Sequence, residues 1–474
     1  MPAERAASRL RLAVAGLTLA GLCIASKPLA AQTLTLGEVL ASSRAHVPQV
    51  LEAIARVRAA EGRRLAADGA FDVVFRGNTD ARLGGFYDGK VLGGTVTRPL
   101  QNFGGEVYAG YRLSDGRFPV YEDERFTNEL GELKVGVMFA LLRDRMIDDR
   151  RFALSQSDAD IDLARNEQLI VAIGVQRRAM DAYGAWVATG LRLAVLRDLL
   201  ALAENRQDGI RRQVAGGQKP RILLVENDQI ILRRQTLVVE AEQALAVAAA
   251  RLSLFVRDEA GKPLVSSSAR LPPSLPPMPM STIDLSAVAA ARPDLRVIDI
   301  RMRQARERLA LTLNSFLPRL DLVLETSRDL GAVGAGGPPR SGTEPSIGLR
   351  FSVPLQQRTA KGQRAANEAE IDVQAQRRRQ LEDQIGVELE TIQTDLAATR
   401  RLVELAVAEQ ARAAEVARAE RRRFELGASD LFLVQLREET EASTRIRAIE
   451  ASWRQVQARA ELAAATADLP ALGL

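Results

Sequence analysis

The sequence predicts an internally duplicated protein of the α+β class, in which very long helices alternate with short regions of β-strand. Two observations support this prediction. Residues 148–214 and 358–426 are long runs of helix-forming residues with an apolar seam, whereas residues 71–141 and 318–353 alternate between apolar and polar side chains. Both patterns occur twice in the same order, which is typical of a repeated structural unit.

The amino terminus has the composition of a secretory signal peptide, which we place at residues 1–31. Arginines precede a short apolar run, residues 12–24, and small residues follow near Ala30 and Ala31. The apolar run is too short to span a membrane comfortably. Cys23 is the single cysteine and lies inside this segment, so we expect the exported chain to contain no disulfide.

Composition and charge narrow the classes of function. Lys and Arg total 65 against 60 Asp and Glu, a net charge of +5 with the two signs interspersed. This pattern is typical of solvated helix faces and not of a nucleic-acid-binding patch. Aromatic residues make up 4% of the chain, which favours closely packed helices. Beyond the signal peptide, no segment approaches the length of apolar sequence that a transmembrane helix needs.

The first repeat, residues 32–257, is expected to contain two short helices, a strand region and one long helix. The first helix is interrupted early by Pro48, and Gly216 and Gly217 end the long helix. The predicted elements in order are a helix at 36–67, strands within 71–141, the long helix at 148–214 and a shorter helix at 221–256.

A connector rich in proline and serine, residues 258–282, precedes the second repeat, residues 283–474. Pro293 lies near the start of its first helix, as Pro48 does in the first repeat. The predicted elements are a helix at 283–313, strands within 318–353, the long helix at 358–426 and, after Gly427, a shorter helix that ends near residue 467.

The long helix of the second repeat needs partners of its own length. Its seam consists of apolar residues spaced three, four or seven apart: Leu381, Ile385, Leu389, Ile392, Leu396 and Val403. At ~1.5 Å per residue it would be on the order of 100 Å long. In each repeat the two shorter helices together match the long one, so we expect them to stack end to end along it. This predicts a rod with strands at one end and helix turns at the other.

Several short motifs point to a known family. They are Arg292-Pro-Asp-Leu-Arg, Leu317-Pro-Arg-Leu-Asp-Leu, Phe351-Ser-Val-Pro-Leu, Phe424-Glu-Leu-Gly-Ala-Ser-Asp-Leu and, in the first repeat, Leu141-Leu-Arg-Asp-Arg. In their order and duplication they resemble the outer membrane efflux protein family, the TolC-like channels of Gram-negative bacteria. The resemblance extends over nearly all of the chain that follows the signal peptide.

The resemblance implies a homotrimer with a coiled-coil tunnel across the periplasm. Each chain would contribute about four strands to a shared twelve-stranded barrel in outer membrane lipid. A single chain has too few strands to close a barrel by itself, and an open sheet edge is not tolerated in lipid. The first repeat contains more alternating sequence than two strands require, including residues 91–98. Either its strands are long and bent, or a β-hairpin lies outside the barrel.

The family's activity implies an exit duct of a tripartite export system. Small molecules or polypeptides would pass through it from an inner-membrane pump of the RND or ABC type, which a periplasmic adaptor connects to the channel. Efflux and type I protein secretion both use such a component, so the cargo stays open. The alternative is a periplasmic coiled-coil scaffold or adaptor protein without a pore.

The resemblance also places a narrow entrance at the helix turns of the periplasmic end. Gly217 and Gly427 would form these turns, which need a left-handed backbone. Acidic residues of the family fall on Leu433 and Leu436 here. The candidate gate or entrance charges that remain are Asp430, Arg437 and Glu438 at the second turn and Lys219, Arg221, Glu226 and Asp228 at the first. The alternative for each is an ordinary solvated charge.

The sequence offers little for catalysis, so we expect no enzymatic activity, cofactor or metal. His46 is the only histidine and stands beside Pro48, where a role at a helix start is the simpler interpretation. Residues 84–90 imitate a phosphate-binding loop, but Val91 stands where that loop needs Ser or Thr. A secreted enzyme is therefore the least favoured class of function.

Overall fold

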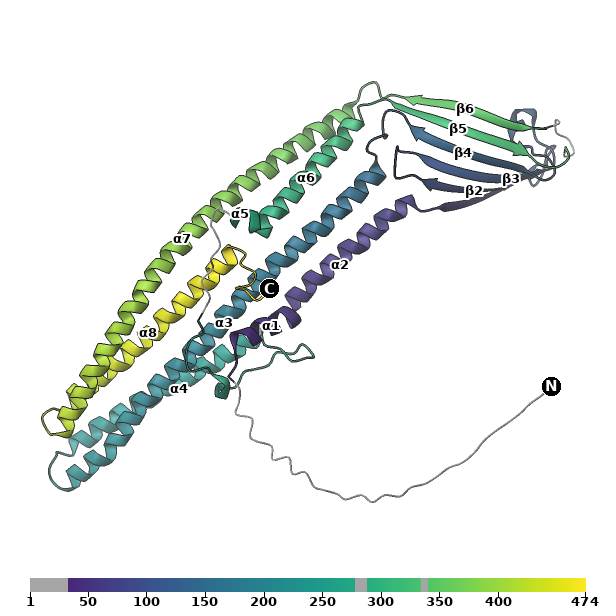
Figure 1. Cartoon of the computed structure of the whole chain (residues 1–474). Helices are drawn as coiled ribbons and strands as arrows, with labels where there is room; N and C mark the ends of the chain where they lie inside the picture. Colours follow the sequence, from purple (N-terminus) through teal and green to yellow (C-terminus); the bar gives the residue numbers. More distant parts are fainter. Residues whose placement is uncertain (1–32, 278–287, 334–339) are drawn as a thin grey trace, which may run out of the picture.

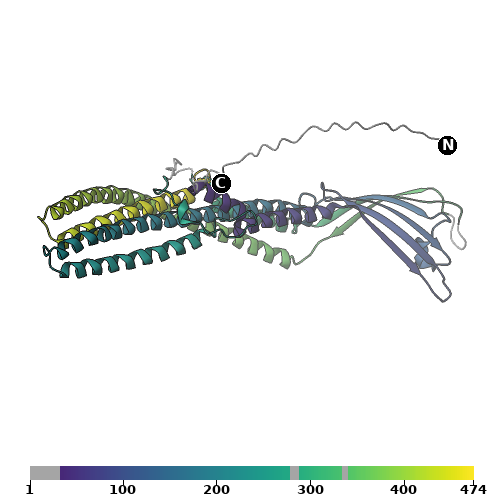
Figure 2. The same ribbon diagram turned by 90° about the horizontal axis from the view of Figure 1, so that it is seen from below.

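The computed structural model describes residues 33–277, 288–333 and 340–474. The predicted signal peptide therefore lies outside the described residues, together with the end of the connector. The described part of the chain is a long rod of helices with a β-sheet at one end (Figures 1 and 2). None of the described helices is long and apolar enough to cross a membrane. The predicted fold class, long paired helices in two repeats joined to strands, is confirmed.

Proline residues divide the helices of both repeats at corresponding places. Pro48 and Pro293 each occupy a first-turn position of a helix, where the missing backbone N–H costs nothing. The helices of the first repeat are α1 (Leu36–His46), α2 (Pro48–Asp68), α3 (Asp149–Ala215) and α4 (Ile222–Leu252). Those of the second are α5 (Val288–Ala291), α6 (Pro293–Asn314), α7 (Arg358–Glu425) and α8 (Leu431–Ala465).

Each long helix is covered by shorter ones. α3 has 67 residues and packs against α1, α2 and α4, whereas α7 has 68 residues and packs against α6 and α8. Contacts of α3 with α6 and α8 join the two repeats side by side (Figure 1). The shorter helices thus stack along the long ones as their lengths predict.

The main core surrounds the middle of α3. Tyr183, Trp186 and Val187 of this helix are buried against α1, α4 and the carboxy-terminal residues of the chain. The Tyr183 hydroxyl donates a hydrogen bond of 2.7 Å to the carbonyl of Leu34, and burial raises the pKa of Tyr183 to about 12. The segment before α1 is thereby fixed to the longest helix of the first repeat.

The described strands form one antiparallel sheet of six strands in the order β1-β2-β3-β4-β5-β6. Four of them come from the first repeat and two from the second, so the β4–β5 pair joins the repeats. The strands are β1 (Val74–Ala81), β2 (Lys90–Pro99), β3 (Glu106–Asp115), β4 (Glu132–Ala140), β5 (Arg319–Asp329) and β6 (Thr343–Ser352).

The strand number corrects one expectation. The resemblance implies about four strands per chain, whereas the described residues contain six. The alternating segment at residues 91–98 belongs to β2, which pairs with β1 on one side and β3 on the other. Turns at residues 82–89, 100–105 and 116–131 reverse the chain three times, so the first repeat contributes four strands, which form the hairpins β1–β2 and β3–β4.

Candidate functional site

The first candidate is the face of the sheet on which the apolar side chains gather, here called the apolar face. The strand register brings most of the large apolar side chains of the six strands onto the same side. They are Phe75 on β1; Leu92 and Val96 on β2; Val107, Ala109, Tyr111 and Leu113 on β3; Leu133, Val135, Val137 and Phe139 on β4; Leu320, Leu322 and Leu324 on β5; and Pro345, Ile347, Leu349 and Phe351 on β6.

Exposure on this sheet is the reverse of that in a water-soluble protein. Along β3 the apolar residues Val107, Tyr111 and Leu113 are exposed, while the polar residues between them are partly buried. No described α-helix covers either face of the sheet, which extends beyond the end of the rod (Figures 1 and 2). An uncovered apolar surface of this extent marks contact with a partner or a membrane.

The opposite face, here called the polar face, carries paired charges. Arg112 of β3 donates to Glu132 of β4 at 2.6 Å. Glu325 of β5 accepts a hydrogen bond of 2.6 Å from the Tyr108 hydroxyl and pairs with the Lys134 ammonium at 2.9 Å. Alternation of an apolar face with a polar, ion-paired face is typical of a barrel with lipid outside and water inside.

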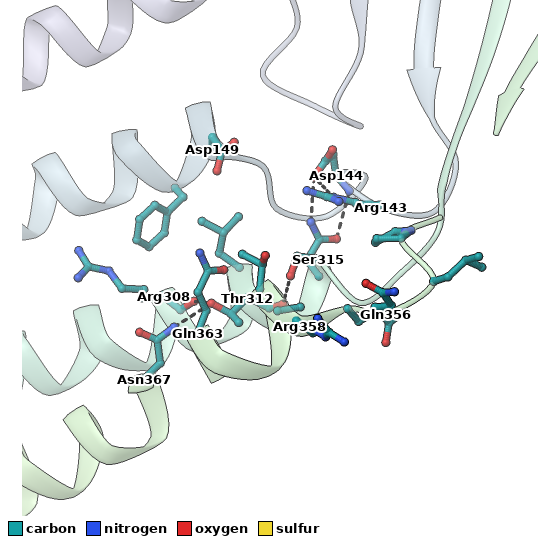
Figure 3. A pocket seen from close by; sticks show the side chains of 18 residues that line it. Arg143, Asp144, Asp149, Arg308, Thr312, Ser315, Gln356, Arg358, Gln363 and Asn367 are labelled. Carbon is teal, nitrogen blue, oxygen red and sulfur yellow. Dashed lines mark hydrogen bonds and ion pairs between the residues drawn. The ribbon is translucent and has the colours of Figure 1, made fainter. Parts of the chain in front are cut away.

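A hollow of about 970 Å³ lies where the sheet joins the helices (Figure 3). Asn314 at the end of α6 connects two chain passages there. Its side-chain oxygen accepts from the Asp144 amide at 3.1 Å, and its amide group donates to the Asp144 carboxylate at 2.9 Å and the Ile147 carbonyl at 3.1 Å. Gln357 has a left-handed backbone, with φ of 51°, and donates to the Phe316 carbonyl at 3.2 Å.

These contacts join the end of α6 to the segment between β4 and α3 and to the start of α7. Across the described residues, no group of three or more His, Cys, Asp or Glu side chains is placed to hold a metal ion. His46 lies at the end of α1, directly before the Val47–Pro48 junction.

The second candidate is the end of the rod opposite the sheet, where two helix turns lie near each other (Figure 1). Gly217 and Gly427 have φ of 70° and 76°, as the sequence predicts for these turns. Both turns end a helix in the same way. The amide of Gln218 donates to the carbonyl of Gln213 at 2.9 Å, and the amide of Ala428 donates to that of Arg423 at 2.8 Å. This six-residue closure is the Schellman motif.

Replacing either turn glycine by alanine should affect stability only through the left-handed backbone conformation. Nothing lies within 4 Å of a Cβ added at Gly217 or Gly427, so Gly→Ala at either position introduces strain without a clash. We expect each change to lower the free energy of unfolding by about 1–2 kcal/mol, the cost of a left-handed alanine. Thermal unfolding monitored by circular dichroism measures it.

The matched control is Gly386→Ala in the middle of α7, where a Cβ also meets no atom. Its backbone is helical, so alanine should stabilise the protein by roughly 0.5–1 kcal/mol. If Gly→Ala changed the stability in the same direction at Gly386 as at Gly217 and Gly427, it would contradict the conclusion that the turn glycines are needed for their left-handed backbone.

Most of the predicted entrance charges are exposed around the two turns. Asp430 caps α8, since its carboxylate accepts from the Leu433 amide at 2.8 Å. Asp228 accepts from the side chain of Gln207. Those that are simply exposed are Lys219, Arg221, Glu226 and Arg437. They remain available to solvent or to a partner.

Glu438 differs from the other predicted charges because it is buried, with 1% of its surface exposed. Its carboxylate forms ion pairs with Arg206 of α3 and, at 3.1 Å, with Arg234 of α4. Arg234 also donates to the Leu199 carbonyl at 2.6 Å. Burial lowers the pKa of Arg206, although the charge of Glu438 opposes this shift. Glu438 therefore ties α8 to the first repeat and does not line an open entrance within one chain.

Sequence reasoning missed Arg206 and Arg234. Arg206 lies three residues after Ala203 on α3, and Arg234 lies four residues before Val238 on α4. Each arginine therefore shares a helix face with a buried apolar residue. An arginine within an apolar stripe is the signal that could have revealed them, because a buried guanidinium needs an anion. The sequence alone does not identify which carboxylate supplies it.

Comparison with known proteins agrees with this architecture. Residues 285–468 match the family described as outer membrane efflux protein. No curated protein sequence matches the chain.

Solved structures share the fold over almost the whole chain. The outer-membrane channel OprN superposes with a TM-score of 0.65 at 15% identity, covering 91% of this chain and 89% of its own. The outer membrane protein VceC of Vibrio cholerae gives 0.62 at 14% identity, covering 91% and 95%. The Campylobacter jejuni CmeC outer membrane channel gives 0.62 at 11% identity, covering 97% and 94%.

At these identities the solved structures show the fold. Together with the family match, they confirm the resemblance that the sequence motifs predict. The family match also confirms the predicted location, the outer membrane of a Gram-negative bacterium with a large periplasmic part.

Proposed function

We propose that this protein is an export duct, because residues 285–468 match the outer membrane efflux protein family and nearly the whole chain shares the fold of outer membrane channels. The sheet would lie in the outer membrane, with the apolar face toward lipid and the polar face toward a water-filled lumen. The helices would form a tunnel through the periplasm. The observation that carries the proposal is the reversed exposure along β3, whose apolar residues Val107, Tyr111 and Leu113 are exposed while the residues of its polar face are partly buried.

A homotrimer is the assembly that we propose. The α7 helix exposes apolar residues that its own chain leaves uncovered, and neighbouring copies would bury them. They include Val387, Leu402, Leu405 and Val407. The buried seam of α7, which includes Ile385 and Ile392, already faces its partners within the chain. One long helix with two apolar sides suits a closed ring of helices better than a single rod.

The turn end would receive a periplasmic adaptor and, through it, an inner-membrane pump of the RND or ABC type. The exposed charges Lys219, Arg221, Glu226 and Arg437 surround the two turns and suit a polar docking surface. Leu433 and Leu436 stand where acidic residues occur in the family, so this entrance would be less negative. Export of small molecules and secretion of polypeptides both fit such a duct.

The test is electrical. Purified protein reconstituted in planar bilayers should give discrete conductance steps, because the polar face would line a water-filled path. Crosslinking of intact cells should give a trimer in the outer-membrane fraction. A monomer recovered from the soluble periplasm, silent in bilayers, would support the rival scaffold or adaptor without a pore.

A further inference from the structure

The apolar face does not run straight across the sheet. We take as a reference row the residues that the register places side by side: Phe75, Val96, Ala109, Val135, Thr326 and Pro345. On β6 and β5 the apolar residues extend from this row toward the helices, as far as Phe351 and Leu320. On β2 they extend from it in the other direction, as far as Leu92.

On β4 and β3, which lie in between, the apolar residues shift gradually from the helix side of the reference row toward its other side. On β4 the apolar residues reach from Phe139 on the helix side to Leu133, and on β3 they reach from Val107 to Leu113. Charged residues on the same side limit the band at its ends. Arg328 ends it on the outer side of β5, and Arg98 ends it on the helix side of β2.

The shift has the slope of a membrane barrel. From β6 to β2 the centre of the band moves by about five residues over four strand intervals, roughly 17 Å along the strands for roughly 19 Å across them. This corresponds to strands inclined by about 40°, inside the 35–45° range of membrane barrels. The apolar residues therefore form one band that would lie parallel to the membrane plane while the strands are tilted. The apolar residues of β2 follow the same shift as those of β3 to β6.

The first hairpin has the same two faces as the rest of the sheet. On β1, Arg76, Asn78 and Asp80 all lie on the polar side, and no charged residue lies on the side of Phe75. Phe75 and Leu92 are 71% and 61% exposed. A hairpin outside the barrel would leave these side chains in water, whereas lipid would cover them at the level of the band.

The backbone pairing leads to the same conclusion. β2 pairs with β3 along its full length, from Lys90 opposite Asp115 to Pro99 opposite Glu106. A barrel built from β3 to β6 alone would need the edge of β3 for the next copy and would have to break this ladder. The free edges in the described sheet are instead those of β1 and β6.

We propose that all six described strands of each chain lie in the membrane, and that β1 of one copy pairs with β6 of the next. In an antiparallel sheet of six strands, β1 and β6 run in opposite directions. Copies can therefore join edge to edge with every pair antiparallel and no edge left open in the lipid. Three copies of six strands make an eighteen-stranded barrel. This inference rests on the proposed trimeric channel and concerns its wall.

Cysteine crosslinking tests the edge contact on a nearly cysteine-free background, since Cys23 lies within the predicted signal peptide. Asn78→Cys on β1 is combined in turn with Ser346→Cys, Gly348→Cys or Arg350→Cys on the polar side of β6. Under oxidation one combination should give covalent dimers and trimers on a denaturing gel, while each single variant should not. Arg76→Cys with Thr95→Cys, neighbours within one chain, is the positive control.

The opposing result comes from β3. If Gly110→Cys on β3 crosslinks between copies to the same β6 positions and Asn78→Cys does not, the first hairpin lies outside the barrel and the inference is wrong. Gly110 is suitable because an added Cβ meets no atom closer than 3.4 Å.

Lipid contact provides a second, independent readout. A fluorophore on Leu92→Cys should be quenched by brominated lipids, and one on Thr95→Cys, on the polar side of the same strand, should not. Leu324→Cys on β5 is the reference. Quenching at 324 without quenching at 92 would overturn the inference but leave the proposed channel intact. Quenching at neither position would count against both.

Discussion

Replacing Glu438 by glutamine is expected to cause the largest loss of stability among single changes at the turn end. The substitution keeps the size of the side chain but leaves Arg206 and Arg234 charged, buried and without their anion. Removing one partner of a buried ion pair typically costs ~3–5 kcal/mol. Hydrogen exchange of the first turns of α8, together with thermal unfolding, should show that α8 separates from α3 and α4 more readily.

The neighbouring residue supplies the control. Glu439 pairs with Arg233 at 3.7 Å, and the two side chains are 41% and 71% exposed. Glu439→Gln should therefore change the stability by less than ~1 kcal/mol. Equal effects of the two substitutions would contradict the role of Glu438.

A compensated variant separates the missing charge from the altered packing. Exchanging the whole cluster for apolar residues, with Arg206→Met, Arg234→Met and Glu438→Leu, removes the unpaired charges as well as the pair. Such replacements are often neutral or stabilising. The triple variant is thus expected to recover much of the stability that Glu438→Gln loses.

Placing arginine at Leu324 is expected to prevent assembly in the outer membrane. Leu324 lies on the apolar face of β5, and an arginine there would have to enter lipid. The cost at the bilayer midplane is about 2–4 kcal/mol per chain and is paid by every copy in the barrel. The amount of detergent-resistant oligomer in the outer-membrane fraction, measured on a gel, should fall strongly.

Arginine at the adjacent residue tests which face of β5 is in contact with lipid. Val323 lies on the polar side of the same strand, opposite Gly348 of β6. Val323→Arg introduces the same side chain toward the lumen, so the oligomer should form at nearly the normal level. Equal tolerance of arginine at 323 and 324, or equal failure, would show that the two faces do not differ in their contact with lipid.

Much of the fold follows from local periodicity. Residues two apart share a strand face, and residues three, four and seven apart share a helix face, so neighbouring residues encode both patterns. The seam of α7 was predicted in this way, and its members Ile385 and Ile392 are buried in the structure. The turn glycines were predictable for a similar reason, because the left-handed conformation they adopt is a property of one residue.

The candidate site was only partly predictable. The alternating segments indicated a sheet with one apolar face, but they did not indicate that the first repeat supplies two hairpins or that β4 joins β5. Glu438 was recognised as a charge near the turn, yet its burial depends on α3 and α4, more than 200 residues away along the chain. Nothing in its own neighbourhood distinguishes it from the exposed Arg437.

The sequence by itself determined the two repeats, the order of helices and strands, the apolar seams and the sites of the turns. Each of these depends on residues close together in the chain. The tertiary structure decided the strand neighbours, the tilt of the apolar band, the free edges at β1 and β6 and the burial of the Arg206, Arg234 and Glu438 cluster. These features depend on which distant segments meet, because strand register and burial are properties of pairs of elements.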